Sequence, residues 1–248
     1  MSRHGADLIV GRPPPRFQSA RRSAQTEVLD DGGLDLAETA DILRDLARFN
    51  RLMMGHRPLL RWLDRVTRAA PPDESVTLLD VGCGYGDLLR AVRRWADKRG
   101  RRLRLVGIDL NPQVVEIARS ATDTADDIAF EVADAVNFAP PYSIDLIVSS
   151  LLTHHLSDTE IVEFLRWMER SARRGWAICD LQRGAIPFHF IGLAGPLLRL
   201  HPVVTYDGRV SVTRALTRGE WRQRIAAARV APAEIGWFMF RFVIGRLK

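Results

Sequence analysis

The stretch VTLLDVGCGYG at residues 76–86 decides the fold of this chain. It begins with a mostly apolar run and ends with three glycines at alternate positions, Gly82, Gly84 and Gly86. Such a run is typical of a strand that is buried on both faces of a parallel sheet. The glycines allow a sharp turn and a close approach of the backbone to a ligand, and the next helix, expected over 87–99, would point its N-terminus at that ligand. The sequence therefore predicts a strand, a ligand-binding loop and a helix in succession.

Strands and helices alternate around and after this loop. The expected strands are 76–81, 103–108, 128–132, 144–149 and 176–181. The expected helices are 87–99, 112–120 and 159–172. This rhythm implies right-handed crossovers and an open sheet. After a further helix at 218–228, segments 234–240 and 242–247 are expected to close the sheet as an antiparallel pair. The predicted fold is α/β, a Rossmann-like doubly wound seven-stranded sheet with the last strand antiparallel.

Three regions are expected along the chain. Residues 1–33 carry three consecutive prolines and an Asp-Asp-Gly-Gly turn, and we expect a flexible N-terminal tail there. Residues 34–72 are expected to form a helical cap, with helices at 36–49 and 58–69. The sheet domain would occupy 73–248 and include an apolar insert at 185–213, after the fifth strand.

Composition narrows the class of protein. Apolar residues make up 46% and charged residues 27% of the 248 residues, which is the balance of a globular protein with a sizeable core. No apolar run is long enough to span a membrane, and the N-terminus lacks the pattern of a secretory signal. Cys83 and Cys179 are too few for a disulfide framework, so we expect a cytoplasmic protein. The net charge of +6 raises the question of a nucleic-acid partner, but no RNA-binding module is visible and we do not expect one.

Carboxylates follow three successive strands of the predicted sheet. Asp80 precedes the glycines, Asp109 ends the second strand and Asp134 follows the third. An acid about 20 residues after the glycines can accept hydrogen bonds from both hydroxyls of a ribose. Asp80 is placed to hold an ammonium group, and Asp134 to meet an adenine amino group. Asp87 follows the last glycine and would oppose a pyrophosphate, but a sulfonium cation would be tolerated there.

The segments LLDVGCGYG at 78–86, GIDLNP at 107–112 and ADA at 133–135 resemble the motif series of the class I methyltransferases. The resemblance covers residues 36–245 and implies that S-adenosylmethionine is the cofactor. It implies the cofactor-binding residues Asp80, Gly82, Gly84, Gly86, Asp109, Leu110, Asp134 and Ala135, with Ser149 facing the methionine part. We expect no metal site.

The loop SSLLTHHL at 149–156 follows the fourth strand, beside the expected methyl group. If the acceptor is a phenol or an activated carbon, a base helps to remove its proton, and His154 or His155 is a candidate. The alternative is a histidine that caps the next helix or bonds to the loop backbone. Asp180 ends the fifth strand at the same edge, either as a structural residue or facing the substrate.

The segment FNRLMMGHR at 49–57 is similar to the N-terminal segment of ubiquinone and menaquinone C-methyltransferases. The whole chain resembles more closely a bacterial branch of small-molecule methyltransferases of polyketide and phenolic-lipid pathways. The resemblance implies substrate contacts by Asn50, His56, Arg57 and Arg209, although Arg57 and Arg209 could equally form surface ion pairs. The insert at 185–213 is expected to wall a pocket for a hydrophobic substrate, to touch a membrane surface, or simply to pack on the sheet.

The expected function is methyl transfer from S-adenosylmethionine to a small hydrophobic aromatic acceptor, phenolic or polyketide-like, by O-methylation. One alternative is C-methylation of a quinone or aromatic ring precursor. Another is RNA methylation, against which no Asn-Pro-Pro-Tyr type motif follows the fourth strand. A non-catalytic binding protein is a third, and the intact set of acids and glycines argues against it. The sequence does not predict an oligomeric state.

Overall fold

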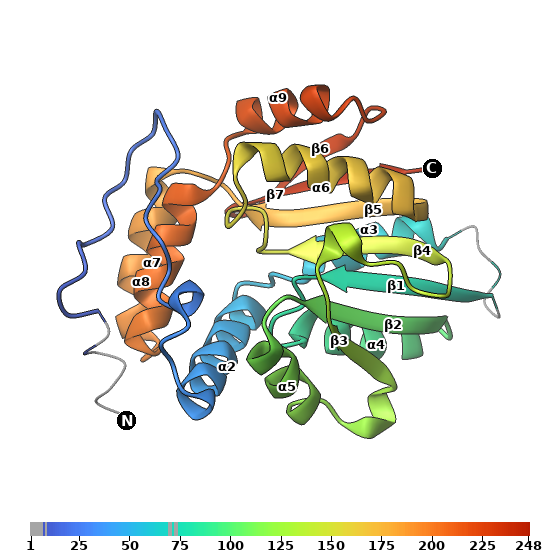
Figure 1. Cartoon of the computed structure of the whole chain (residues 1–248), viewed down its shortest axis with the longest axis horizontal. Coiled ribbons are helices and arrows are strands. Elements are labelled where there is room, and N and C mark those ends of the chain that lie inside the picture. Colours follow the sequence, from blue (N-terminus) through green and yellow to red (C-terminus); the bar gives the residue numbers. More distant parts are fainter. Residues whose placement is uncertain (1–6, 8, 69–70, 72–73) are drawn as a thin grey trace.

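The computed structural model describes residues 7, 9–68, 71 and 74–248. They form a seven-stranded sheet with the order β3-β2-β1-β4-β5-β7-β6 (Figure 1). The strands are β1 (Ser75–Val81), β2 (Arg102–Asp109), β3 (Ile128–Val132), β4 (Ile144–Ser150), β5 (Ala172–Leu181), β6 (Glu234–Phe238) and β7 (Arg241–Leu247). Strands β1 to β5 pair in parallel, whereas β7 is antiparallel to both β5 and β6. The predicted Rossmann-like sheet with an antiparallel last strand is confirmed.

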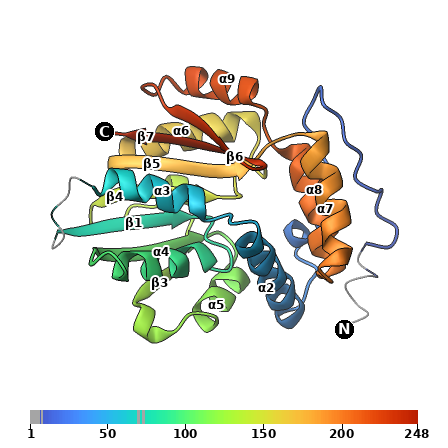
Figure 2. The ribbon, with the colours of Figure 1, turned by 180° about the vertical axis from the view of Figure 1, so that it is seen from behind.

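Helices cover both faces of the sheet and its carboxyl edge. Buried residues of α3 (Arg57–Val66), α4 (Asp87–Asp97) and α5 (Pro112–Ser120) pack on one face. Those of α6 (Asp158–Ser171) and α9 (Arg218–Ala228) pack on the other. The helices beyond the carboxyl ends of the parallel strands are α2 (Leu36–Leu52), α7 (Ala185–Leu197) and α8 (Pro202–Arg214) (Figures 1 and 2). Short 3-10 turns η1 (Leu29–Asp31), η2 (Thr124–Asp126) and η3 (Ala135–Asn137) complete the fold.

Strand β1 lies at the centre of the sheet because both of its faces are apolar. Leu78 belongs to the core cluster on the α4 face, and its neighbour Leu79 belongs to the cluster on the α6 face. Both side chains are fully buried. Successive side chains of a strand point to opposite faces, so only a strand covered on both sides can place two adjacent leucines in two cores. This placement is why the stretch reads as a nearly continuous apolar run.

The glycine-rich loop comes directly after β1, and its first glycine has no room for a side chain. The backbone N–H groups of Gly82 and Cys83 both donate to the carbonyl of Ile108 on β2, at 2.9 and 3.0 Å. Gly82 has φ 67°, and a Cβ at this position would lie 2.9 Å from Leu152. A glycine is therefore required here by both backbone conformation and space.

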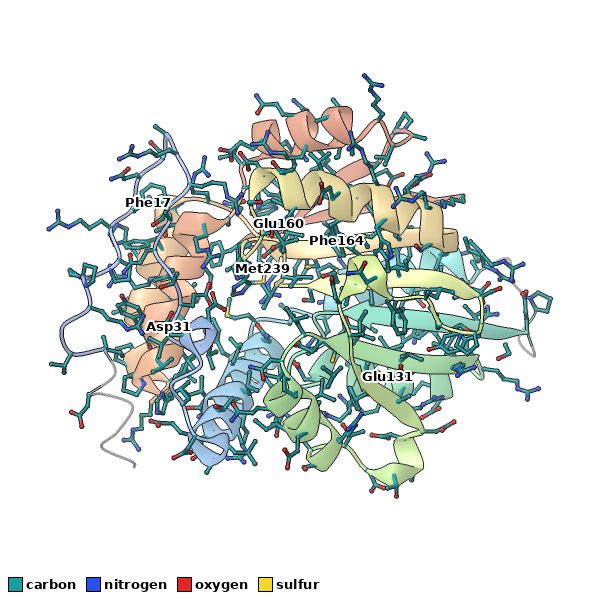
Figure 3. The ribbon with its side chains drawn as sticks, in the orientation of Figure 1. Phe17, Asp31, Glu131, Glu160, Phe164 and Met239 are labelled. Carbon is teal, nitrogen blue, oxygen red and sulfur yellow. The ribbon has the colours of Figure 1, made fainter. Side chains whose placement is uncertain are left out.

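The apolar insert forms two helices, α7 and α8, at the carboxyl edge of the sheet. The segment before α2, where we expected a flexible tail, packs against them. Val28 is 1% exposed, its backbone N–H donates to Asp207 of α8 at 2.8 Å, and that of Ser23 donates to the carbonyl of Thr213 at 3.0 Å. The rings of Phe17 and Phe188 lie 5.8 Å apart, centroid to centroid. Figure 3 labels Phe17 and Asp31 on this segment. We call residues 9–33 the N-terminal strap.

Two smaller differences from the expected elements concern helix and strand ends. Helix α6 stops at Ser171 because Ala172 is already extended, and β5 therefore begins at Ala172, four residues before the apolar core of the strand at Trp176. Helix α3 ends at Val66, and the expected end of this helix at Ala69 falls outside the described residues. In the described part of the chain, no helix combines the length and the apolar character that crossing a membrane requires.

We predict that Gly107→Ala lowers the free energy of unfolding by about 1–3 kcal/mol, the usual cost of overpacking a core. A Cβ on Gly107 would lie 2.8 Å from Leu89 and 2.9 Å from Cys83 and Phe130, between β2 and the glycine-rich loop. Urea unfolding measures the change. Gly33→Ala is the matched control, because open space surrounds that glycine, and its effect should stay within about 0.5 kcal/mol. Equal stability of the two variants would contradict this packing.

Candidate functional site

A cavity of about 640 Å³ lies at the carboxyl edge of the sheet. On one side it is bounded by the glycine-rich loop, by the end of β2 and by the loop after β4. On the other side lie α2, α7, α8 and the N-terminal strap. Its polar lining includes Glu27, Asp30, Asn50, Asp109, His154, His155, Asp207, Ser211 and Arg241.

Asp109 is held at the cavity wall by backbone N–H groups. One carboxylate oxygen accepts from Gly84 at 3.1 Å, and the other accepts from Asn111 at 3.0 Å. Burial raises the pKa of Asp109, and these backbone donors counteract part of that rise. Each oxygen still has a free lone pair that can accept a further hydrogen bond. The neighbouring Leu110 also lines the cavity and is 73% exposed, so its apolar side chain is available to a flat ligand.

Asp80 lies at the end of β1, beneath this wall, and is 1% exposed. Its Oδ1 atom has no hydrogen-bond partner among the described residues. Burial raises the pKa of Asp80 well above its ordinary value, and the charges of Asp87 and Asp109 raise it further. An unpaired buried carboxylate is costly unless a cation or a donor approaches it. Asp80 therefore fits the role of holding the ammonium group of a bound ligand.

Asp80 is not among the residues that line the cavity, and four further predicted cofactor residues also lie away from the lining. The carboxylate of Asp134 caps η3, where it accepts from the backbone of Val136 at 3.2 Å and from the side chain of Asn137 at 2.6 Å. The neighbouring Ala135 packs against the core on the α6 face. The hydroxyl of Ser149 is buried and donates to the carbonyl of Val81 at 2.9 Å, which ties β4 to β1.

The fourth of these residues, Gly86, caps the N-terminus of α4 with φ 74°. A Cβ at Gly86 would lie 2.7 Å from the ring of Phe130. Its role in the structure is therefore to let α4 start close to β3. Of the predicted cofactor set, the residues that line the cavity are Gly82, Gly84, Asp109 and Leu110.

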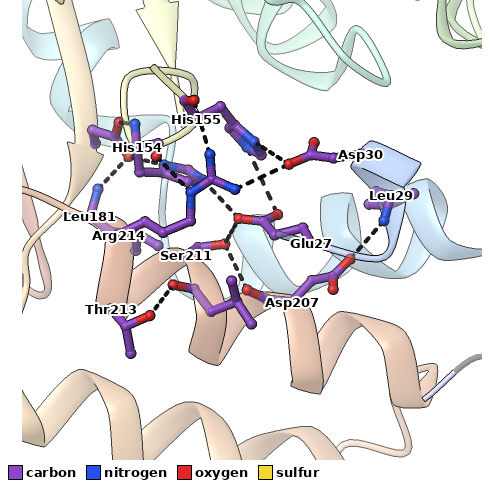
Figure 4. Close-up of polar contacts among 12 residues, drawn as sticks. Glu27, Leu29, Asp30, His154, His155, Leu181, Asp207, Ser211, Thr213 and Arg214 are labelled. Carbon is purple, nitrogen blue, oxygen red and sulfur yellow. Dashed lines mark hydrogen bonds and ion pairs between the residues drawn. The ribbon is translucent and has the colours of Figure 1, made fainter. Parts of the chain in front are cut away.

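His154, labelled in Figure 4, is buried. Asp180 holds it on one side. Its Nδ1 lies 2.7 Å from one oxygen of Asp180, and its backbone N–H donates to the other oxygen at 2.9 Å. The hydroxyl of Thr153 also donates to Asp180. Burial alone would raise the pKa of Asp180, but the charge of His154 and these hydrogen bonds lower it to about 2. Asp180 is an ionised residue that positions His154, and it is not among the residues that line the cavity.

His155 is partly exposed and faces two acids of the N-terminal strap. Its Nδ1 lies 3.1 Å from Asp30, and its Nε2 lies 3.8 Å from Glu27. Burial lowers the pKa of His155, but the hydrogen bond to Asp30 and the charges of Glu27 and Asp30 outweigh it and raise the pKa to about 9. The Nε2 of His154 also points toward Glu27, at 3.5 Å. His154 thus lies between Asp180 at the end of β5 and Glu27 of the strap, whereas both acids beside His155 come from the strap.

Sequence reasoning missed the acids of the strap and of α8. Glu27 is buried and accepts from the hydroxyl of Ser211 at 2.7 Å. Asp207 accepts from the backbone of Val28 and Leu29, and burial together with the charge of Glu27 raises its pKa to about 7. The only local signal was an acidic pair, Glu27 and Asp30, in a segment that otherwise reads as turns.

Two arginines hold the loop between β4 and α6, which we call the histidine loop, from its outer side. Arg214 of α8 donates to the carbonyl of His154 at 3.0 Å and to that of His155 at 2.9 Å, and it lies 3.2 Å from Asp30. Arg22 of the strap donates to the carbonyl of Leu156 at 2.8 Å. The loop between β4 and α6 is therefore held in place by the strap and α8 as well as by the sheet.

Of the predicted substrate residues, Asn50 alone lines the cavity, where its side-chain oxygen accepts from Arg241 at 2.8 Å. His56 pairs with Asp87 at 2.8 Å, outside the cavity lining. Arg57 is exposed and contacts Met54. The guanidinium of Arg209 lies 4.2 Å from the ring centre of Phe188, where it packs between α7 and α8. These three, like Asp180, are not positioned to touch a ligand in the cavity.

Comparison with known proteins finds similarity to methyltransferases. Residues 78–175 match a family model described as a methyltransferase domain. A 28% identical relative is trans-aconitate 2-methyltransferase from Azoarcus sp. strain BH72, aligned over 70% of this chain and 60% of that protein. The chain thus spans less than two thirds of the length of this relative.

Two solved structures share the fold. Human N-acetylserotonin methyltransferase in complex with SAM is 17% identical with a TM-score of 0.60, over 99% of this chain and 65% of that one. Magnesium protoporphyrin IX methyltransferase from Synechocystis PCC 6803 with bound SAH is 15% identical with a TM-score of 0.53, over 88% and 89% of the two chains. These two likenesses show a shared fold, and the match to the methyltransferase domain covers residues 78–175.

We predict that Ser149→Ala lowers the free energy of unfolding by about 1–3 kcal/mol, because the buried carbonyl of Val81 loses its donor. The affinity for S-adenosylmethionine should stay within about twofold, since the hydroxyl is already engaged between β4 and β1. Thermal unfolding and calorimetry measure the two quantities. The exposed Ser120→Ala is the control and should change stability by less than about 0.5 kcal/mol. A tenfold loss of cofactor affinity in Ser149→Ala would instead place this hydroxyl on the cofactor.

Proposed function

We propose that this chain transfers the methyl group of S-adenosylmethionine to a small hydrophobic acceptor that bears an aromatic ring. The observation that carries the proposal is that one cavity has two chemically different sides. The glycine-rich loop and Asp109 bound one side, and apolar side chains of α2, α7 and α8 bound the other. Donor and acceptor would therefore meet in one space at the carboxyl edge of the sheet, which is where open α/β sheets bind ligands.

Five residues are proposed to hold the cofactor. Asp109 would accept hydrogen bonds from the ribose hydroxyls, Leu110 would cover the adenine, and Asp80 would balance the ammonium charge. Gly82 and Gly84 allow the loop backbone to approach closely. When bound, the cofactor supplies a methyl group on a cationic sulfur. The buried acids Asp80 and Asp109 suit that positive charge, and the oxygen of Asp80 that has no hydrogen-bond partner among the described residues supports the assignment.

The acceptor side of the cavity is apolar. Its lining includes Leu43, Leu46, Phe49, Ile191, Leu200 and Val204. Such a surface favours an aromatic or acyl-tailed molecule, and holding it against the donor while excluding water is the main task of a methyl-transfer site. Polar groups from both sides of the cavity meet around His154 and His155, which supports an acceptor with an acidic hydroxyl and hence O-methylation. C-methylation of an aromatic ring precursor would use the same cavity and is the alternative.

A transient contact with a membrane surface stays a prediction. Helix α7 leaves three apolar side chains, Ile186, Leu193 and Leu197, between 74% and 79% exposed. This face of the insert is where a lipidic acceptor would be collected if that prediction is correct.

We predict that Asp109→Ala weakens S-adenosylmethionine binding by about 1–3 kcal/mol, because charge-assisted hydrogen bonds are lost and their partners are left unpaired. Calorimetric titration of the purified chain with S-adenosylmethionine measures the change. Asp123→Ala is the matched control, since this aspartate caps η2 on the surface, and its affinity should equal that of the wild type. If the wild-type chain does not bind S-adenosylmethionine at millimolar concentration, the proposed function is refuted.

We predict that His154→Gln and His155→Gln each leave cofactor affinity unchanged and slow turnover by about 10²-fold or more, the usual contribution of a positioned acid–base group beside the acceptor. Formation of S-adenosylhomocysteine with a panel of phenols and hydroxylated aromatic polyketides measures turnover. His189→Gln, on the exposed side of α7, is the control and should retain full activity. Normal turnover in both cavity variants would remove the histidines from the reaction.

A further inference from the structure

Glu27, His154 and His155 form a compact cluster in the cavity wall (Figure 4). Glu27 comes from the N-terminal strap, and the histidines come from the loop between β4 and α6. One side-chain nitrogen or oxygen of each residue lies within 4.8 Å of the other two. Glu27 and His154 are buried, whereas the side chain of His155 is 28% exposed. The cluster therefore combines three metal-ligating groups in a sheltered place that opens on the cavity.

The two imidazole rings are oriented in the same way. Each Nδ1 lies against a carboxylate, that of Asp180 for His154 at 2.7 Å and that of Asp30 for His155 at 3.1 Å. An ionised carboxylate only accepts hydrogen bonds, so each Nδ1 carries a hydrogen and each Nε2 points toward Glu27. A carboxylate behind the second nitrogen is the arrangement that fixes the tautomer of metal-binding histidines.

The spacing of the three groups suits a shared ion. The Nε2 atoms lie 3.5 and 3.8 Å from the oxygens of Glu27, beyond the usual 2.7–3.2 Å of a hydrogen bond. Metal–ligand bonds of about 2.0–2.2 Å in a tetrahedral site place neighbouring ligand atoms about 3.3 Å apart. The two distances, each to a different oxygen of Glu27, are close to this edge length. One ligand atom of each residue lies within 4.8 Å of the other two, so small movements of the side chains would let them share an ion.

We propose that Glu27, His154 and His155 bind one divalent first-row metal ion, Zn²⁺ in preference to Mg²⁺. Two imidazoles favour zinc and its neighbours, whereas magnesium prefers oxygen ligands. Three protein ligands leave a fourth tetrahedral position, and in this site it faces the cavity, as in catalytic zinc sites. Asp180 and Asp30 are positioning residues that hold the two rings.

A metal ion in this place would indicate which chemical class of acceptor the site takes. This inference rests on the proposed function. An ion with an open position binds a phenol or enol oxygen and lowers its pKa, so that the acceptor binds as its anion. The acceptor would then carry an acidic oxygen that can ligate a metal, in addition to its apolar ring. The competing arrangement has two protonated histidines paired with acids and no ion, and it is the alternative outcome of the test.

The test is direct metal binding by the full chain, prepared without a polyhistidine tag and stripped with a chelator. Titration with Co²⁺ reports ligation through its visible absorption, and titration with Zn²⁺ should displace the cobalt. We expect one equivalent of Co²⁺ per chain. Glu27→Gln and His154→Gln should weaken binding at least 100-fold, and Asp180→Asn by about 10–100-fold because the supporting carboxylate is lost. His189→Gln, remote from the cluster, should bind like the wild type.

Uptake of Co²⁺ and Zn²⁺ by the wild type no stronger than by His154→Gln would overturn the site and leave the ion-pair arrangement. The same holds if His189→Gln loses as much binding as the cluster variants. Circular dichroism and S-adenosylmethionine affinity show whether each variant is folded. If Glu27→Gln does not fold, His155→Gln is used in its place, because this residue lies at the partly exposed edge of the cluster. Metal binding without cofactor binding would refute the proposed function alone, so the two failures are distinguishable.

Discussion

A carboxylate that is removed from water needs a positive partner or hydrogen-bond donors, and this requirement organises the carboxyl edge of the sheet. Asp109 meets it with two backbone N–H groups, and Asp180 meets it with His154 and Thr153. Glu27 meets it with Ser211 and two histidines. Asp80 has an oxygen for which the described residues offer no donor. The pattern of satisfied and unsatisfied acids therefore marks where the protein itself completes the site and where a ligand has to.

The sheet could be predicted from the sequence because its determinants are local. Adjacent leucines at 78 and 79 can be buried together only in a strand that is covered on both faces, and a Cβ added to Gly82 or Gly86 of the following loop would meet a neighbouring side chain. Asp109 was found for the same reason, since it ends a strand that pairs with β1. The same reasoning places Asp134 on the cofactor, but in the structure its carboxylate caps the short turn η3. A cap aspartate and a ligand-binding aspartate look alike in sequence.

The other half of the site depends on contacts that no local pattern encodes. Glu27 reaches the histidines across more than a hundred residues of chain, and what places it there is the packing of Val28 and the hydrogen bonds of the strap to α8. Prolines, arginines and turn-forming residues suggested a flexible tail, yet the same residue types can form a strap once a partner helix supplies donors and acceptors. Arg22 and Arg214 were likewise indistinguishable from solvated surface charges until the loop carbonyls that they bind were known.

The family match covers the residues on one side of the cavity and not those on the other. The matched domain, residues 78–175, contains the glycine-rich loop, Asp109 and the histidine loop, but it stops before α7 and α8 and begins after the strap and α2. The apolar wall and Glu27 thus come from parts of the chain outside the match. In the proposed function the acceptor lies against those parts, so the strap and the insert would determine its identity, while the strand ends would bind the cofactor. A single fold can in this way keep one donor and change its acceptor by altering only what covers the carboxyl edge of the sheet.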